Sequence, residues 1–326
     1  MPGRTYSGRV PRRADAGLAA IVAERYGLRR LPPIVQLTGG YGNDVFRLGQ
    51  VVVRIAGPRA TEAELEYEHR LVERIAARVP EVSAPLHTLD GKTVVAFGRL
   101  LGSVWPWIDG RAGARRSATT AATAGALLAR IHAAGLEVGP LPSRPGQPSL
   151  ADLDLRENWM WDVDAALAFR PDPLLEDAWS ELGETIELCR GAGLVTGVVH
   201  GDYYSRNVIV RRARAVGVID WDYAKPEWLV WELARSTWEF AKDKRLHDLR
   251  PERARLFLEA YRSAGGPVPR EEEHLLRPLM RSVRTEEALR HLTDGARGRP
   301  WDPRYTAHNL RAFANLRERA DVPFDA

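Results

Sequence analysis

Three polar residues in one short stretch have the types and the spacing to carry out chemistry together. Asp202 follows an apolar run and a His-Gly pair, and Asn207 comes five positions later. Two β-branched runs then follow, and Asp220 stands at the end of the second. A carboxylate can accept a proton from a hydroxyl group. A second carboxylate and an amide oxygen are suitable ligands for a hard cation such as Mg²⁺, which also keeps waters. The stretch therefore predicts a magnesium-dependent reaction at a hydroxyl.

The interval between Asp202 and Asn207 is that of the catalytic loop of kinases. In that loop the Asp accepts the proton of the substrate hydroxyl and the Asn holds magnesium. Asp220 arrives at the end of the next strand, where a kinase has its second metal ligand. Phosphoryl transfer needs little covalent work from the protein, so a positioned hydroxyl, a base and compensated phosphate charge are sufficient.

The residues around these three indicate the local structure that holds them. The runs 208–210 and 216–219 are β-branched, and a basic segment, 211–215, separates them. This pattern predicts a hairpin with a turn at 211–215, and it presents the polar side chains at one rim. An ordinary hairpin with surface Asp and Asn residues is the alternative, and the three intervals together argue against it.

His-Gly-Asp-x4-Asn at 200–207, followed by Ile-Asp-Trp-Asp at 219–222, resembles the aminoglycoside phosphotransferase family. The resemblance covers roughly 35–240. It implies an α+β, two-lobed, protein-kinase-like fold, in which a small lobe with an antiparallel sheet and a helix precedes a large, mostly helical lobe. It also implies ATP and Mg²⁺ as cofactors, with Asp202 as the catalytic residue and Asn207 and Asp220 as metal ligands. Trp221 stands where protein kinases have Phe-Gly.

A glycine-rich turn that contains Gly40 and Asn43 lies between two predicted strands, 34–37 and 51–55. Backbone amides in such a turn can approach phosphates closely, although Gly-Gly also marks ordinary hairpins. The family often has a Ser/Asn pair here. Asn43 matches the Asn, whereas Gly42 replaces the Ser. The resemblance assigns Gly40 and Asn43 to nucleotide binding.

Arg54 occupies the position of the kinase strand lysine, and Arg can hold phosphates through bidentate contacts. Alternation along the strand also allows an outward-facing Arg54. A kinase needs one inward Glu on the following helix, predicted at 61–78. The family places this Glu seven residues before an apolar position of the helix, here Ile75, which selects Glu68 among several acidic residues.

The runs 93–97 and 103–108 predict the last two strands of the small lobe, joined by 98–102. In the family the hinge that follows binds adenine. Trp105 and Trp107 are therefore candidates for stacking on the base, and packing at the lobe junction is the alternative for each. The expected division is a nucleotide-binding lobe at 1–107 and a catalytic, substrate-binding lobe at 108–326.

In the large lobe, an Ala-rich helix at 117–134 carries His132, which we expect to be packed and hydrogen-bonded near the catalytic loop. Glu232 stands where the family usually has Asp, and we expect it to brace the catalytic loop. Closing helices are predicted at 236–242, 251–263, 271–295 and near 307–319, with Arg and Glu alternating on their outer faces.

The segment 150–190 is strongly acidic and contains interspersed aromatic residues, among them Trp159 and Trp161. In the family the helical insert at this place helps to form the acceptor pocket. An acidic, aromatic wall would suit a cationic amine or sugar. A solvated helix pair with its aromatic residues turned inward explains the same composition.

Composition excludes several classes of protein. Hydrophobic residues make up 44% and charged residues 28%, which is typical of a soluble globular protein. A single cysteine, Cys189, excludes an intrachain disulfide and a cysteine-based metal site. The net charge of +4 comes from dispersed Arg, so no nucleic-acid partner is expected. No apolar run suits a membrane span or a signal peptide, and we expect a cytoplasmic monomer or homodimer.

The predicted activity is ATP-dependent transfer of the γ-phosphoryl group to a hydroxyl of a small molecule. An antibiotic of the aminoglycoside type is the first hypothesis for the acceptor. A metabolic kinase for homoserine, a choline-like amino alcohol or a sugar is equally compatible with the motifs. An inactive, kinase-like nucleotide-binding protein is the alternative from another class, and the complete Asp/Asn/Asp set argues against it.

Overall fold

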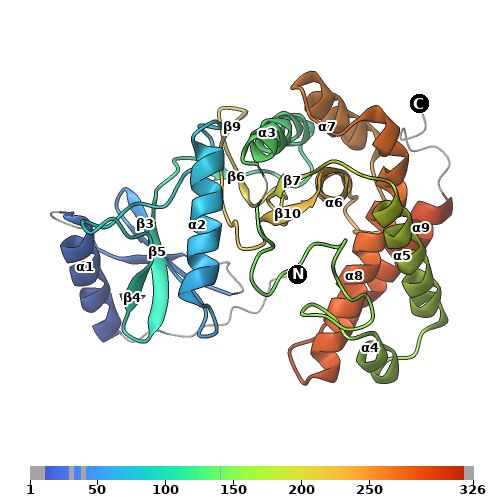
Figure 1. Cartoon of the computed structure of the whole chain (residues 1–326), viewed down its shortest axis with the longest axis horizontal. Helices are drawn as coiled ribbons and strands as arrows, with labels where there is room; N and C mark the ends of the chain where they lie inside the picture. Colours follow the sequence, from blue (N-terminus) through green and yellow to red (C-terminus); the bar gives the residue numbers. More distant parts are fainter. Residues whose placement is uncertain (1–11, 29–32, 38–41, 140, 319–326) are drawn as a thin grey trace. The chain divides into compact units, whose positions relative to one another are not determined.

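The computed structural model describes residues 12–28, 33–37, 42–139 and 141–318. The chain divides into two compact units, Met1–Asp109 and Gly110–Ala326. The first unit holds an antiparallel sheet with helices, and the second is mostly helical (Figure 1). The division lies two residues beyond the boundary expected from the sequence.

The sheet of the first unit is antiparallel, with the strand order β1-β2-β3-β5-β4. Its strands are β1 (Val35–Leu37), β2 (Asp44–Leu48), β3 (Val51–Ile55), β4 (Val95–Phe97) and β5 (Leu100–Pro106). The connection predicted at 98–102 is too long, because β4 ends at Phe97 and β5 begins at Leu100. Gly98 takes a positive φ of 67°, which lets a tight turn return the chain directly into β5.

Helices α1 (Arg12–Tyr26) and α2 (Glu62–Ala76) cover opposite faces of this sheet (Figure 1). Val51 and Val53 of β3 belong to the core cluster that contains Val22 of α1. Because side chains alternate along a strand, Arg54 points to the other face, where Glu68 of α2 accepts its hydrogen bond. Alternation thus decides the direction of Arg54, which the sequence left open.

Thr61 fixes the start of α2. Its hydroxyl accepts a hydrogen bond from the backbone N–H of Glu64, and the Glu64 carboxylate accepts one from the backbone N–H of Thr61. This capping box satisfies amides that have no partner inside the helix. It therefore sets the register in which Glu68 faces the sheet.

Two small sheets form the strand part of the second unit. β6 (Arg111–Ala112), β8 (Val208–Arg211) and β9 (Arg214–Val218) make one, and β7 (Thr196–Val199) pairs with β10 (Lys225–Trp228) in the other. The predicted five-residue turn at 211–215 is wrong, because Arg212 and Ala213 alone turn the chain, both with positive φ. That backbone is the one favoured by two-residue hairpin turns.

The helices of the second unit differ in length and burial. They are α3 (Ala118–Glu137), α4 (Val163–Phe169), α5 (Pro173–Gly191), α6 (Leu229–Ala241), α7 (Pro251–Ser263), α8 (Leu276–Ala296) and α9 (Pro303–Glu318), with a 3-10 turn η1 (Arg270–Leu275) before α8. Helix α3 packs closely on α7, since a Cβ added at Gly125 would lie 2.2 Å from the carbonyl oxygen of Phe257.

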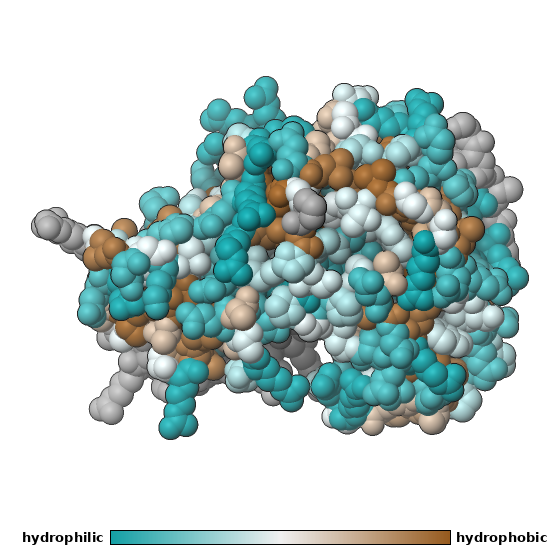
Figure 2. All heavy atoms as spheres, in the orientation of Figure 1, coloured by the Kyte–Doolittle hydropathy of each residue, from teal (hydrophilic) through white to brown (hydrophobic). Residues whose placement is uncertain are grey.

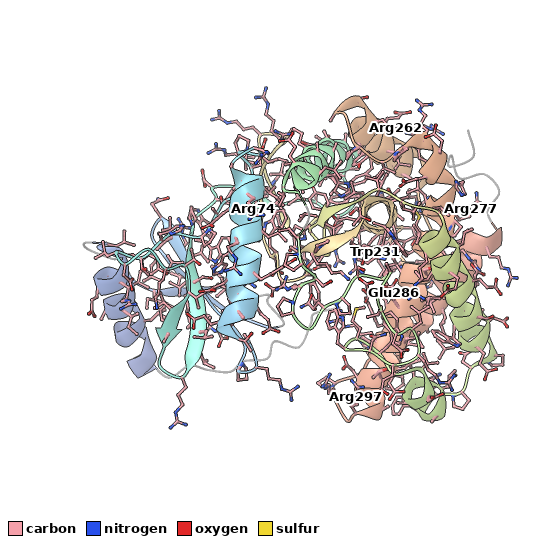
Figure 3. All side chains as sticks on the ribbon, viewed as in Figure 1. Arg74, Trp231, Arg262, Arg277, Glu286 and Arg297 are labelled. Carbon is pink, nitrogen blue, oxygen red and sulfur yellow. The ribbon has the colours of Figure 1, made fainter. Side chains whose placement is uncertain are left out.

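Helix α8 is buried along most of its length, which corrects the prediction that its Arg and Glu residues lie on an outer face. It packs against α4, α5, α6 and α9. Arg281, Arg284 and Glu286 are each about 5% exposed or less. Arg281 is paired with Glu181 of α5, and Arg284 donates to Asn309 of α9, so the buried charges find partners on the neighbouring helices. Figure 3 labels Glu286 beside Trp231, with Arg297 at the far end of the helix.

Large exposed hydrophobic residues are scattered over different elements, and the face drawn in Figure 2 is mainly hydrophilic. Cys189 is buried, and burial raises the pKa of its thiol to about 12. Within the described ranges, no helix has both the length and the apolarity needed to cross a membrane.

Candidate active site

The loop after β7 is shaped by Gly201. Its φ is +80°, and a Cβ at this position would lie 2.3 Å from the carbonyl oxygen of Tyr223. Both the left-handed backbone and the close approach exclude larger residues. Gly201 therefore presses the loop against the 221–224 turn and presents the next residue, Asp202, at its tip.

Glu232 of α6 braces this loop from beneath, as predicted. Its fully buried carboxylate accepts hydrogen bonds from the backbone N–H of His200 at 2.8 Å and of Gly201 at 2.5 Å. His132 Nε2 lies 3.0 Å from the same carboxylate, and its Nδ1 lies 2.8 Å from the hydroxyl of Tyr261. Burial opposes ionisation, but these hydrogen bonds and the charge interaction with His132 outweigh it and lower the pKa of Glu232. The packed role predicted for His132 is confirmed.

His200 is held in one tautomer by the backbone. Its Nε2 lies 3.0 Å from the carbonyl oxygen of Ile219, and its Nδ1 lies 3.2 Å from the backbone nitrogen of Asp202. A carbonyl only accepts, so Nε2 carries the proton and Nδ1 accepts from the Asp202 amide. The buried ring thus ties the Asp202 backbone to the end of the hairpin.

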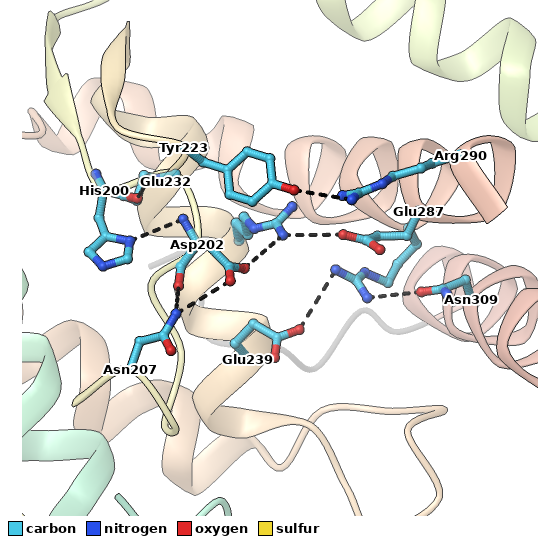
Figure 4. A network of polar contacts seen from close by, with 12 residues as sticks. His200, Asp202, Asn207, Tyr223, Glu232, Glu239, Glu287, Arg290 and Asn309 are labelled. Atoms are coloured by element: carbon cyan, nitrogen blue, oxygen red, sulfur yellow. Dashed lines mark hydrogen bonds and ion pairs between the residues drawn. The ribbon is translucent and has the colours of Figure 1, made fainter. Parts of the chain in front are cut away.

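Asn207 lies next to Asp202. Its Nδ2 donates to the Asp202 carbonyl at 2.9 Å and to Asp202 Oδ2 at 3.3 Å. The amide oxygen consequently points away from Asp202, as Figure 4 shows. Burial raises the pKa of Asp202, and Arg235 opposes this shift. An ionised aspartate with a raised pKa is a better proton acceptor than an aspartate with an ordinary pKa.

Asp220 is brought to the same end of the hairpin. The backbone N–H of Ile219 donates to the carbonyl of Asn207 at 2.9 Å, beside the Val208–Val218 pair of the ladder. Asp220 follows the end of β9 and has a φ of +71°, an unusual backbone for a non-glycine residue that Asp and Asn tolerate best. Its side chain is exposed.

The donor set at this end of the hairpin fits Mg²⁺ that arrives with a nucleotide. It offers the amide oxygen of Asn207 and the carboxylate of Asp220, both hard ligands. Among the described residues, no group of three or more His, Cys, Asp or Glu could hold a metal ion by itself. Phosphate oxygens and waters would have to complete the coordination, which is how Mg²⁺ is usually bound at phosphate sites.

Arg235 of α6 contacts Asp202 from the other side. A single nitrogen, Nη2, lies 3.2 Å from Asp202 Oδ1 and 3.2 Å from Glu287 Oε1. Glu287, on α8, also accepts a hydrogen bond of 2.8 Å from the hydroxyl of Tyr305. Burial acts to raise the pKa of Glu287, but Arg235 and Arg290 outweigh it and lower this pKa to about 2. Arg235 therefore bridges two carboxylates, one from the catalytic loop and one from α8.

Tyr223 and Arg290 lie beside this bridge. Arg290 Nη2 donates to the Tyr223 hydroxyl at 3.1 Å, and the Tyr223 ring stacks on Trp159 with ring centroids 6.1 Å apart. Figure 4 shows Tyr223, Arg290 and Glu287 grouped on one side of Asp202. Trp159 is 37% exposed. These residues give the surroundings of Asp202 an aromatic and a cationic component.

In the first unit, the structure joins two of the predicted residues directly. Arg54 Nη1 lies 2.7 Å from Glu68 Oε1, and the Glu68 side chain is almost completely buried. The pair is well shielded from solvent, so it fixes the direction of the guanidinium more firmly than a surface ion pair would.

The remaining candidates of the first unit have different surroundings. The guanidinium of Arg47 lies 3.8 Å from the ring centroid of Trp107, and Trp105 Nε1 donates to Ser103 Oγ at 2.7 Å. Both tryptophans thus have partners within their own unit. Asn43 is half-buried directly before β2, whereas Gly40 lies outside the described residues.

The acidic segment 150–190 uses about half of its acids in contacts within the segment. Asp162 and Asp172 cap α4 and α5. Asp154 accepts from backbone amides, Arg156 pairs with Asp164, and Arg190 pairs with Glu187. Trp161 is fully buried. The alternative of a solvated helix pair with inward aromatic residues therefore describes most of this segment, and Trp159 is the exception near Asp202.

Sequence reasoning missed the contacts of Arg235, Glu287, Arg290 and Tyr223. One signal was present for Arg235, since it follows the predicted brace Glu232 by three positions on a helix and therefore lies on the same face. Glu287 and Arg290 are also three apart, but nothing local to α8 indicates which loop it packs against.

The sequence pattern of the phosphotransferase enzyme family, APH, matches residues 33–279. The chain belongs to this family. Among curated relatives, a homoserine kinase from Rhodopseudomonas palustris (strain HaA2) is 26% identical over 288 residues, 85% of each chain. A homoserine kinase from Methylobacterium sp. (strain 4-46) is 26% identical over 310 residues, covering 89% of this chain and 90% of the relative.

Solved structures of low sequence identity share the phosphotransferase fold. An amicoumacin kinase has a TM-score of 0.71 at 15% identity and covers 95% of this chain and 96% of its own. A choline/ethanolamine kinase family protein from Mesorhizobium loti has a TM-score of 0.66 at 19% identity, covering 95% and 97%. The predicted α+β, kinase-like fold is confirmed, and the protein is a small-molecule phosphotransferase.

Proposed function

We propose that this phosphotransferase moves the γ-phosphoryl group of ATP to a hydroxyl of a small metabolite with a homoserine-like or amino-alcohol backbone. The observation that carries the proposal is the grouping of Asp202, Asn207 and Asp220 at one end of a short hairpin. Asp202 orients the acceptor hydroxyl and accepts its proton. Its contacts with Asn207 and Arg235 fix the direction of the carboxylate.

Asn207 and Asp220 would hold Mg²⁺, which neutralises phosphate charge when it is bound with the nucleotide. Arg54, held by Glu68, binds the phosphates, while Gly40 and Asn43 belong to the loop that covers them. Trp105 and Trp107 stay candidates for the adenine side of the site, although each already has a partner.

The surroundings of Asp202 support a metabolite more than a polycationic antibiotic. Arg235 is paired with Asp202, and Arg290 lies next to this pair. Several of the acids of 150–190 that were expected to attract a cation are engaged in caps and ion pairs. The homoserine kinases among the relatives agree with this choice. An antibiotic acceptor is the second candidate, favoured by the TM-score of the amicoumacin kinase.

The test is Mg²⁺-dependent ADP release from ATP across a panel of hydroxylated acceptors. The panel contains L-homoserine, choline, ethanolamine, 3-aminopropanol, simple sugars, aminoglycosides and amicoumacin. Asp202→Asn is measured alongside, with Asp177→Asn on the exposed face of α5 as the matched control. Loss of a general base costs about 10²–10⁴-fold in rate, so Asp202→Asn should nearly abolish release while ATP still binds.

Each outcome of this panel discriminates between the candidates. Release with a metabolite supports the proposal, and release only with an antibiotic supports the second candidate. ATP binding without release for any acceptor favours the inactive alternative. If Asp202→Asn keeps full activity while both variants fold, the assignment of the base is wrong.

A further inference from the structure

Arg290 is a partly buried cation, and among the described residues its hydrogen-bond partner is a neutral group. Its Nη2 donates to the hydroxyl of Tyr223 at 3.1 Å. In the part of the chain that the structure describes, no carboxylate lies within ion-pair distance of this guanidinium. Burial favours the neutral form, but the interactions with Tyr223 and Glu287 outweigh it and raise the pKa of Arg290, so the group is charged.

Arg290 is related to the catalytic loop through one direct contact and through its position on α8. Tyr223 lies between the guanidinium of Arg290 and the backbone of Gly201, the residue before Asp202. Arg290 also shares the face of α8 with Glu287, which is joined to Asp202 through Arg235. The contact with Tyr223 and the position on α8 therefore place Arg290 beside the assigned base.

A guanidinium has five N–H donors in a planar fork, and the phenol of Tyr223 uses one of them. Arg290 is only partly exposed to water, and an anion or several acceptors would compensate its charge better than the phenol alone. A carboxylate matches the fork with two parallel hydrogen bonds. The arrangement has the character of a receptor for an anionic group of a ligand.

The position relative to Asp202 indicates which ligand carries the anion. Asp202 Oδ2 faces Asn207, the candidate metal ligand, whereas Oδ1 faces Arg235 and α8. Figure 4 shows Asn207 and Arg290 on different sides of Asp202. The nucleotide phosphates belong with the metal ligands, so an anion on the α8 side belongs to the acceptor.

We propose that Arg290, oriented by Tyr223, binds a carboxylate of the acceptor while the acceptor hydroxyl lies at Asp202. The inference rests on the proposed kinase function and narrows it to hydroxy acids, foremost hydroxy amino acids. Glu287, two contacts from Asp202 through Arg235, would favour an ammonium group next to that carboxylate. Stacking of Tyr223 on the exposed Trp159 gives the same acceptor an apolar wall.

The experiment compares acceptors that differ only in the carboxylate. The pairs are L-homoserine with 3-aminopropanol, L-serine with ethanolamine, and L-threonine with 1-amino-2-propanol. KM and kcat are measured by ADP release for the wild-type protein, Arg290→Met and Arg290→Lys. Arg297→Met, on the exposed end of the same helix, is the matched control.

The wild-type protein should prefer the carboxylate-bearing member of at least one pair. Arg290→Met should raise its KM by about 10- to 100-fold, as expected for the loss of charged hydrogen bonds, and leave the KM for ATP unchanged. The partner without a carboxylate should change little, so the preference within the pair disappears. Arg290→Lys should restore part of the preference for the acceptor with a carboxylate, because lysine supplies the positive charge without the planar donor geometry of the guanidinium.

Other results would overturn the inference. ADP release only with acceptors that lack a carboxylate would contradict the proposed binding of a carboxylate by Arg290. It would not contradict the assignment of the protein as a kinase. An equal rise of the KM for ATP and for both members of a pair assigns Arg290 to the phosphates or to folding. Absence of release with any acceptor overturns the proposed function and this inference together.

Discussion

Arg235 Nη2 lies 3.2 Å from Asp202 Oδ1, so the carboxylate assigned as the catalytic base is already ion-paired. The same nitrogen contacts Glu287 at the same distance. The pairing orients one oxygen of Asp202 and leaves the other toward Asn207. It also opposes the effect of burial on the pKa of Asp202.

Replacement of Arg235 should change the pH dependence of the reaction. Burial raises the pKa of Asp202, and the positive charge of Arg235 lowers it. Arg235→Met removes the largest effect that opposes burial, so the pKa of Asp202 rises further and the ionised base is lost at a higher pH. The acidic limb of kcat/KM should move upward by about one to two pH units. Arg255→Met, on the exposed side of α7, serves as the control. An acidic limb that stays at the same pH in Arg235→Met would contradict the assignment of Asp202 as the base.

Arg54 and Glu68 should act as one unit in nucleotide binding. Arg54→Met and Glu68→Gln should each raise the KM for ATP, and the double variant should cost less than the two effects added, with a coupling of about 0.5–3 kcal/mol. The reason is that either change removes the same 2.7 Å ion pair. Glu66→Gln, in the exposed pair with Arg70, should have little effect. Strict additivity would indicate independent roles.

Magnesium dependence should report on Asp220. Chelation of divalent cations should abolish turnover, and Asp220→Asn should raise the Mg²⁺ concentration needed for half-maximal ADP release, because a neutral amide is the weaker ligand. Asn tolerates the left-handed backbone at this position, so the fold should be kept. The measurement is a Mg²⁺ titration at saturating ATP. An unchanged half-point would exclude Asp220 as a metal ligand.

Glu232→Gln should destabilise the protein at neutral pH by about 1–3 kcal/mol. The two backbone amides of His200 and Gly201 both donate to this carboxylate, and an amide side chain offers one acceptor and turns a donor toward the other. Because the pKa of Glu232 is lowered in the folded protein, its contribution is present above the ordinary value near 4.5 and is lost as the pH falls below it. Urea unfolding at pH 7 and pH 4 measures the difference, which should shrink at the lower pH.

Glu286 should have the opposite pH effect. Its carboxyl is buried beside Trp231, and burial raises its pKa from near 4.5 to about 7. The folded state therefore takes up a proton more readily, and stability falls as the pH rises from about 4.5 to 7. Glu286→Gln removes this loss and should stabilise the protein by on the order of 1–3 kcal/mol at pH 8, with little effect near pH 4.5. Glu259→Gln is an exposed control, and an equal effect at both pH values would refute the shift.

The spacing of Asp202, Asn207 and Asp220 could be interpreted from the sequence because the hairpin that groups them is local. The first and the last are only 18 positions apart, and β-branched runs mark the strands between them. Glu68 was selected by the family resemblance through its spacing from Ile75, and the structure shows that it accepts a hydrogen bond from Arg54.

The acceptor side of the site depended on tertiary structure. Arg235 and Glu287 are separated by 52 positions, and they meet only because α6 and α8 pack against each other beneath the catalytic loop. Glu287 and Arg290 carry no local signal, since charged residues on a helix ordinarily face solvent. Periodicity determines which residues share a face, but only packing decides what that face contacts. The sequence by itself therefore determined the reaction chemistry, while the surroundings of Asp202 that we propose to bind the acceptor were decided by the fold.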